Sequence, residues 1–304
     1  MRTSLLIIFL ICHVALKAQV EMVILGTVQD AGSPQIGCQK DCCSHLWDHP
    51  DHTRKVASIG FIDYTQCYTM MVDATPDIKS QLNYLQGLAG IEDPIPNLIL
   101  LTHAHIGHYM GLLQLGKEAI NAQRAGVAAM PRMANFLRSN GPWSQLVENQ
   151  NIELQPLVSD SSYPVTGDLH YTPILVPHRD EYSETVGYRI TGPEKSVLYI
   201  PDIDKWHLWE HSIIDEIAKV DYALLDASFY DGEELGGRDM SLIPHPTVEE
   251  SLSLFKPLSK SERNKVYFIH LNHTNPLLDT NSRAYKYTTS QGYHIASYGQ
   301  VFKL

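Results

Sequence analysis

The sequence predicts an α/β fold in which two β-sheets and two helical layers form a four-layer α/β/β/α sandwich. Two observations support this fold class. Short runs rich in β-branched and aromatic residues recur in both halves of the chain, and stretches with helical periodicity separate them. Since both halves have this β-plus-α character, each is expected to form one sheet with its own helical layer, with strand ends gathered along one edge.

The N-terminal segment is expected to lie outside this fold. Arg2 supplies a positive charge, Leu5 to Cys12 form an apolar run, and Ala18 is the small residue that signal peptidase prefers. The apolar run is shorter than the roughly 20 residues that a membrane span needs. We therefore expect residues 1–18 to be a signal peptide, and the mature protein to be periplasmic or extracellular without a stable membrane anchor.

Residues 19–304 are expected to form a single domain, because no repeat or linker interrupts them. In the first half we predict strands at residues 20–27, 68–73 and 97–102, and helices at residues 77–87 and 109–125. In the second half we predict strands at residues 169–176, 185–191, 196–201, 222–226 and 265–270, and helices at residues 203–218 and 247–255.

The charge of the chain restricts its partners. The formal net charge is −11 at pH 7, from 23 basic and 34 acidic residues. Nonspecific binding to nucleic acid depends on basic patches, so an acidic chain of this kind argues against it. We expect a small-molecule substrate and no nucleic-acid partner. The sequence gives no indication of the oligomeric state.

A histidine cluster is the strongest chemical signal in the chain. His103 and His105 are two residues apart in a predicted turn, and His108 lies at the start of the helix predicted next. Their side chains can therefore point toward a common site. Apolar residues flank the cluster on both sides, which argues against a solvated surface patch. Neutral imidazoles suit zinc, and iron or manganese would also accept them.

The spacing of these histidines resembles the H-x-H-x-D-H signature of the metallo-β-lactamase superfamily. Four more segments resemble the first, third, fourth and fifth motifs of that superfamily, at residues 70–75, 176–178, 198–202 and 268–273. A lone Asp or His at a strand end usually has a structural role, so each segment is a weak signal by itself. Five motifs in the correct order are a specific signal.

The resemblance implies a centre for one or two catalytic metal ions, with zinc expected and iron or manganese as alternatives. The implied ligands are His103, His105 and His178 for one metal, His108 and His270 for a second, and Asp202 as the bridge between them. Asp73 would orient the histidine loop without binding metal. Gly107 replaces the aspartate ligand of the superfamily, which leaves the filling of the second site open.

A general acid is suggested by two more segments. Asp226 closes a predicted strand and His245 precedes a predicted helix. These segments resemble paired segments of the phosphodiesterase branches of the superfamily, in which a carboxylate supports a general-acid histidine. In the alternative interpretation His245 is an ordinary loop residue and Thr247 caps the helix. Both interpretations stay open at this point.

The branch is narrowed by four stretches that resemble pyrroloquinoline quinone biosynthesis protein B, at residues 26–38, 177–187, 199–206 and 268–276. In that branch the cysteine cluster looks like a structural zinc site. Cys38, Cys42 and Cys43 could therefore bind zinc together with a nearby histidine. A disulfide within the cluster is the alternative, since export would permit oxidation.

Our main functional hypothesis is an exported metal-dependent hydrolase that uses an activated hydroxide on an ester, phosphodiester, lactone or amide. The resemblance supplies an alternative, an iron-dependent oxidative enzyme similar to pyrroloquinoline quinone biosynthesis protein B. The histidine motif of that protein is degenerate, whereas this chain keeps all three histidines, which favours hydrolysis. A third hypothesis is a non-catalytic periplasmic protein that binds a metal or cofactor. Fold alone does not identify the substrate.

Overall fold

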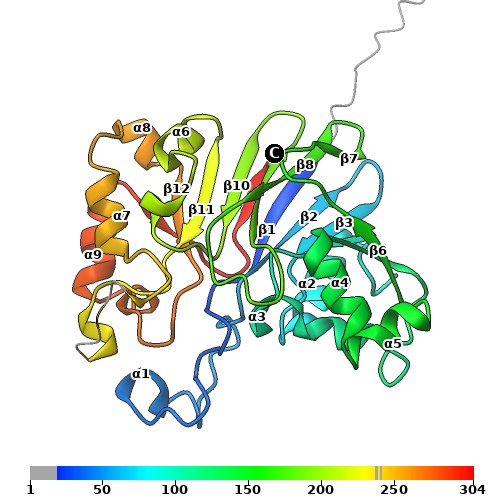
Figure 1. Ribbon diagram of the computed structural model, residues 1–304. Helices are drawn as coiled ribbons and strands as arrows, with labels where there is room; N and C mark the ends of the chain where they lie inside the picture. Colours follow the sequence, from blue (N-terminus) through cyan, green and yellow to red (C-terminus); the bar gives the residue numbers. More distant parts are fainter. Residues whose placement is uncertain (1–18, 237–238, 240–241) are drawn as a thin grey trace, which may run out of the picture.

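Two seven-stranded sheets pack against each other and carry helices on their outer faces (Figure 1). This is the computed structural model of the chain, and it describes residues 19–236, 239 and 242–304. The predicted four-layer α/β/β/α sandwich is confirmed. The predicted signal peptide, residues 1–18, lies outside the described residues. Among the helices that are described, none has the length and apolar character needed to cross a membrane.

The first sheet is antiparallel at one side and parallel at the other. Its strands, in spatial order, are β14 (Val301–Lys303), β1 (Val20–Gly26), β2 (Ser58–Asp63), β3 (Tyr68–Val72), β4 (Leu98–Leu100), β5 (Ala125–Ala129) and β6 (Ile152–Pro156). From β3 to β6 every neighbouring pair is parallel. The helical elements of this half are α2 (Ile78–Ala89), α3 (Ile106–Tyr109), η1 (Met110–Leu115), α4 (Pro131–Ser139) and α5 (Trp143–Glu148).

The second sheet has the same mixed character. Its strands, in spatial order, are β13 (His294–Ile295), β12 (Val266–Ile269), β11 (Tyr222–Asp226), β10 (Ser196–Ile200), β9 (Val186–Thr191), β8 (Leu169–Leu175) and β7 (Tyr163–Thr166). Strands β10 to β13 run parallel to one another. The helices of this half are α6 (Ile213–Ala218), α7 (Val248–Leu254), α8 (Lys260–Arg263) and α9 (Arg283–Ser290).

Strand periodicity explains how the core is divided. Along β1, Met22 and Ile24 face the core between the two sheets, while Val23 and Leu25 face the core beneath the outer helices of the first half. Successive side chains of a strand point to opposite faces, so a strand that is apolar throughout must be covered on both sides. The second sheet and the helices of the first half cover the two faces of β1, and β14 and β2 are its neighbours within the sheet.

Two predicted helices are wrong in extent. The chain between residues 109 and 125 forms only the last residue of α3 and the 3-10 helix η1, which ends where Gly116 becomes extended. Its last residue, Ala125, already belongs to β5. Within residues 203–218 the structure has a short 3-10 turn, η2 (Trp206–Leu208), and then α6. Ser212 starts α6 afresh, because its side chain accepts a hydrogen bond from the backbone N–H of Asp215.

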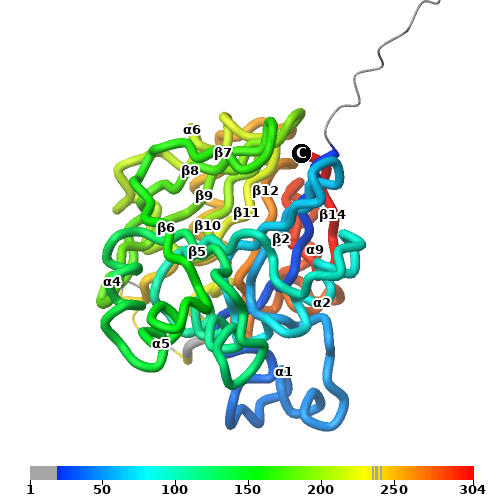
Figure 2. Tube along the Cα trace, turned by 90° about the vertical axis from the view of Figure 1, so that its right-hand side faces the viewer, coloured from blue at the N-terminus to red at the C-terminus, as the bar shows by residue number. Residues whose placement is uncertain are grey.

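The carboxyl ends of the parallel strands gather at one edge of the sandwich, as predicted. The loops that leave β3, β4, β8, β10 and β12 carry predicted site residues, namely Asp73, His103, His178, Asp202 and His270, and Asp226 is the last residue of β11. A long loop from Thr27 to Ala57, which contains α1 (Asp41–Ser44), lies at the same end of the molecule in both views (Figures 1 and 2). Val28 in this loop pairs with Leu271 beyond β12, which joins the N-terminal segment to the second half of the chain.

Candidate metal centre

The histidine loop is held in place by the buried side chain of Asp73. Asp73 follows β3 in a left-handed conformation, with φ of 69°. Its carboxylate accepts hydrogen bonds from the Thr102 backbone N–H at 2.8 Å and from the His108 Nδ1–H at 2.7 Å. Because Nδ1 is engaged, Nε2 of His108 faces the centre of the site. These hydrogen bonds fix the loop and the ring of His108, and the orienting role of Asp73 at a bound metal stays a prediction.

The first group of converging nitrogens comes from His103, His105 and His178. One ring nitrogen of each lies within 4.8 Å of the others. The Nδ1 atom of His105 is 3.3 Å from Nε2 of His178. His103 Nε2 is buried and makes no hydrogen bond within the described part of the chain. A buried polar atom of this kind is unfavourable unless something binds it, and three imidazoles are a donor set that fits zinc.

The second group is formed by Asp30, His108, Asp202 and His270, whose ligand atoms also lie within 4.8 Å of one another. Nε2 of His108 is 2.9 Å from Oδ1 of Asp30 and 2.9 Å from Oδ2 of Asp202. Nε2 of His270 is 3.3 Å and 3.2 Å from the same two oxygens. Two carboxylates and two imidazoles therefore converge on one point.

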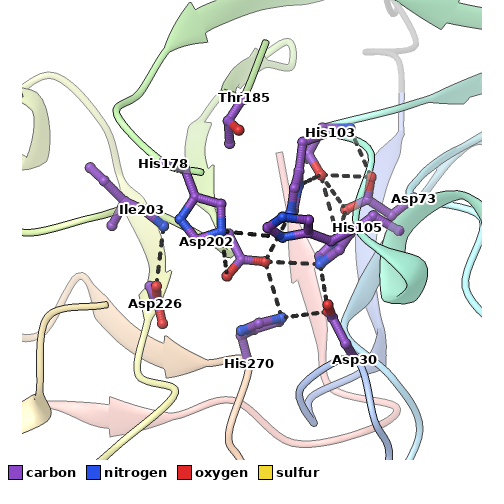
Figure 3. A network of polar contacts seen from close by, with 12 residues as sticks. Asp30, Asp73, His103, His105, His178, Thr185, Asp202, Ile203, Asp226 and His270 are labelled. Carbon is purple, nitrogen blue, oxygen red and sulfur yellow. Dashed lines mark hydrogen bonds and ion pairs between the residues drawn. The ribbon is translucent and has the colours of Figure 1, made fainter. Parts of the chain in front are cut away.

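Asp202 lies between the two groups (Figure 3). Its Oδ2 atom is 3.5 Å from Nε2 of His103, and its Oδ1 atom is 3.8 Å from Nε2 of His178. The same carboxylate contacts His108 and His270 of the second group. The structure thus brings together every residue for which the sequence predicted a role at the catalytic metals, with Asp202 at the position expected of a bridge.

The pKa shifts of the residues in the centre favour the binding of a cation. Burial lowers the pKa of His178 to about 4. Burial also holds the pKa of His103 well below its usual range. Burial alone would raise the pKa of Asp202, but His270 and His108 bring it well below its usual range. Neutral imidazoles beside ionised carboxylates are the protonation states that a metal requires.

His108 is the exception among these histidines. Its burial disfavours the charged imidazolium, but the carboxylates of Asp73 and Asp30 outweigh that effect and raise the pKa of His108 well above its usual value. A cation that binds at Nε2 must therefore displace a proton. Metal affinity at the second group should depend on pH for this reason.

His245 and Asp226 also reach the centre. Nδ1 of His245 donates a hydrogen bond to Oδ2 of Asp226 at 2.8 Å and lies 3.4 Å from Oδ1 of Asp202. Asp226 is fixed in turn by the backbone N–H groups of Ile203 and Ser228, at 3.1 and 2.9 Å. Burial opposes the charge on His245, but the Asp226 carboxylate raises its pKa above the usual value.

The alternative interpretation of this segment also describes a real feature. Thr247 caps α7 by accepting a hydrogen bond from the Glu250 backbone N–H at 3.1 Å, and Glu250 completes a capping box. The cap does not involve the side chain of His245. The cap and the contact between His245 and Asp226 therefore exist side by side, and the general-acid role of His245 stays a prediction.

The cysteine cluster forms a separate site with His273. Sγ of Cys42 is 4.0 Å from Sγ of Cys38 and 3.9 Å from Sγ of Cys43, and the ligand atoms of all four residues lie within 4.8 Å of one another. Thiolates at about 2.3 Å from a tetrahedral zinc are about 3.8 Å apart, whereas a disulfide needs about 2.05 Å. The spacing of the sulfur atoms is compatible with zinc, and His273 is the histidine that lies beside them. Zinc at this cluster stays a prediction.

We expect three thiols to be released from this cluster. Protein denatured with a chelator under non-reducing conditions should show titratable thiols at Cys38, Cys42 and Cys43, in addition to exposed Cys67. A Cys67→Ser variant is the matched control, because it should lower the count by one and leave zinc content unchanged. A count of two, from Cys67 and a single cluster thiol, would instead establish a disulfide between the other two cluster cysteines.

Asp30 and His273 are the two residues of these sites that the sequence did not predict. Asp30 lies in the N-terminal stretch, residues 26–38, whose resemblance to a known family gives this aspartate no role. His273 is three residues after His270, so its closeness to a predicted ligand was visible but its partners were not. Both are placed by contacts between segments that are far apart in the chain.

Comparisons with known proteins show the family and the fold of the chain. A model of the beta-lactamase superfamily domain matches residues 68–271, which is more than half of the chain. Coenzyme PQQ synthesis protein B of Xanthomonas oryzae pv. oryzae (strain MAFF 311018) is 24% identical over 305 residues, covering 91% of this chain and 98% of that protein.

Two solved structures share the fold. Zn(2+)-bound PqqB from Methylobacterium extorquens has a TM-score of 0.75 and 22% identity. The match covers 93% of this chain and 100% of that one. A diphosphatase from the PhnP family has a TM-score of 0.66 and 21% identity, covering 94% of this chain and 97% of that one. At these identities the likeness shows a common fold.

Proposed function

The chain belongs to the beta-lactamase superfamily, with a resemblance to coenzyme PQQ synthesis protein B, and from this premise we propose that it is a metal-dependent hydrolase. The observation that carries the proposal is the position of Asp202. Its Oδ2 atom contacts the second group, at His108 and His270, and its Oδ1 atom lies near His245 and His178. One buried carboxylate thus connects two cation-binding groups and the candidate proton donor.

A divalent metal bound here would lower the pKa of a coordinated water from 15.7 to about 7 and stabilise negative charge that develops on a substrate oxygen. The residues of the chain supply the rest. His245 has Nδ1 fixed by Asp226, which leaves Nε2 as the ring atom able to give a proton to a leaving group. The Asp226 carboxylate sets the orientation of that ring.

The substrate is proposed to be a small molecule with an apolar part. His105 and Glu181 meet at 3.4 Å, with 18% and 52% of their side chains exposed, so they border the centre toward solvent. Their chain neighbours Ile106 and Tyr182 are exposed large apolar residues, at 55% and 62%. We also propose that the protein is exported and that it does not bind nucleic acid. Only features of the sequence support these two statements.

A second candidate is an oxidative enzyme that works in PQQ synthesis. The name of the curated relatives supports it more directly than it supports hydrolysis, since the match to coenzyme PQQ synthesis protein B covers 91% of the chain. The geometry favours hydrolysis, because two groups of ligands share one carboxylate and a histidine with a fixed carboxylate partner lies beside them. A non-catalytic protein that binds a metal or cofactor is the third candidate.

Metal analysis followed by a substrate screen separates these candidates. Protein purified without added metal should contain zinc or manganese in the catalytic centre, with a further zinc at the cysteine cluster. It should hydrolyse at least one of a panel of phosphodiesters, lactones and β-lactams, and chelation should abolish the activity until metal is restored.

Other outcomes would contradict hydrolysis in distinct ways. Stoichiometric iron, uptake of dioxygen with a tyrosine-derived substrate and no hydrolysis would establish the oxidative candidate. Metal or cofactor binding that persists without any turnover would establish the binding protein.

A further inference from the structure

We propose that Asp30, in the N-terminal loop, supplies the carboxylate ligand that the histidine motif lacks at Gly107. The inference depends on the metal centre of the proposed function and goes further, because it assigns a ligand outside all five superfamily motifs. The motif position held by Gly107 is an aspartate in the superfamily that the sequence resembles. Without a substitute, the second group would keep only His108, His270 and Asp202 as protein ligands.

The first argument is steric. A Cβ atom placed on Gly107 would lie 2.3 Å from Oδ1 of Asp30 and 2.7 Å from both its Cα and its Cγ. These distances are far below van der Waals contact. The Cα atom of Asp30 belongs to the backbone, so a change of side-chain rotamer cannot relieve the clash. The Asp30 side chain therefore occupies the space that a side chain at position 107 would need. Glycine at 107 and aspartate at 30 form a complementary pair.

The second argument is the direction of the Asp30 carboxylate. Its Oδ1 atom is 2.9 Å from Nε2 of His108 and 3.3 Å from Nε2 of His270, which are the two histidines implied for the second metal. Only 13% of the side chain is exposed. Two carboxylates, from Asp30 and Asp202, are thus brought close together in a largely buried site. Ligand atoms of the two carboxylates lie within 4.8 Å of each other. Like charges at this separation repel each other unless positive charge lies between them.

The third argument is that the backbone around Asp30 is fixed. The Gln29 N–H donates to the Leu271 carbonyl at 2.9 Å, and the Leu271 N–H donates to the Thr27 carbonyl at 2.8 Å. The Gly32 N–H closes a turn by donating to the Gln29 carbonyl at 2.8 Å. The loop is therefore attached to the residue that directly follows His270. This pairing determines where the carboxylate lies relative to the histidine.

The complete second group then has an Asp₂His₂ composition, and its Asp202 also lies 3.8 Å from His178 of the first group. Four protein ligands are enough for a tetrahedral zinc site. The N-terminal loop would thus restore the charge and the number of ligands that Gly107 removes. The same loop carries Cys38, Cys42 and Cys43, so a structural metal there would help to hold the loop that delivers Asp30.

Zinc titration of the metal-free full chain, in the presence of a competing chelator, tests the proposal without relying on turnover. Asp30→Asn keeps the shape of the side chain and should keep the fold, but it should weaken the second catalytic zinc by at least about 100-fold, since even residues outside the ligand set change affinity by 10 to 100-fold. Asp48→Ala, which removes an exposed carboxylate from the same loop, should bind like the unaltered chain.

The exchange variant gives a sharper result. Gly107→Asp alone should clash with Asp30, whereas Asp30→Gly with Gly107→Asp should recover binding of the second zinc when folded. A folded exchange variant without that recovery would overturn the complementary pairing. Unchanged affinity of Asp30→Asn for two catalytic zinc ions would overturn the assignment of Asp30 and leave the proposed function intact. An unaltered chain that bound no catalytic zinc would overturn both.

Discussion

Asp202→Asn should remove metal from both groups of the centre and lower hydrolysis by at least about 10³-fold, because one carboxylate serves both groups. Asp202 contacts His103 and His178 of the first group at 3.5 and 3.8 Å, and His108 of the second at 2.9 Å. The amide has the same shape but lacks the negative charge. Elemental analysis of the purified variant and its turnover under saturating metal would measure the two effects.

The matched control for this variant is Asp204→Asn, two residues further along the same loop. The Asp204 carboxylate accepts a hydrogen bond from the Lys205 backbone N–H at 2.9 Å and belongs to neither group of ligands. We expect normal metal content and turnover in this control. Full metal content in Asp202→Asn, together with normal turnover, would show that Asp202 does not connect two metal sites.

A strand could be predicted from the sequence where its own residues show that it is buried. The apolar runs at residues 68–73 and 222–226 lie within one residue of the observed strands β3 and β11. The extent of the helix predicted after His108 was not predictable in this way. A Cβ on Gly111 would lie 2.1 Å from the Thr75 carbonyl, so this segment is shaped by close approach to another loop rather than by its own periodicity. The pairing of β14 with β1 likewise joins segments about 280 residues apart in the chain, from Glu21 to Lys303.

The residues of the candidate site fall into the same two classes: those that a local pattern predicts and those that a distant segment places. The residues at His103, His178 and Asp202 follow strand ends in a known order of motifs, so sequence reasoning could find them. Asp30 contacts His270 across 240 positions of the chain. A local sequence pattern indicates which residues belong to the same helix or strand. It does not indicate which distant loop fills the space beside a glycine. The absence of an aspartate at position 107 could be read from the sequence, but its replacement could not.

His245→Ala should leave metal content unchanged and lower turnover of substrates with poor leaving groups by about 10²-fold or more, since a positioned acid typically contributes 10² to 10⁴. Activated nitrophenyl esters should be affected much less, because their leaving group departs without a proton. Asp226→Asn should reproduce part of this selective defect, since Asp226 Oδ2 fixes the His245 ring at 2.8 Å. Parallel measurement of both substrate types in each variant would give the selectivity.

Thr247→Ala is the control that separates proton delivery from the helix cap. This variant removes the capping box of α7 and should lower stability by about 0.5 to 2 kcal/mol, while the preference among leaving groups stays that of the unaltered chain. If His245→Ala behaved like Thr247→Ala, losing stability but not selectivity, the histidine would be a structural loop residue. If His245→Ala lost metal, its 3.4 Å approach to Asp202 would mark it as a ligand. A selective loss with full metal content is expected only if His245 protonates the leaving group.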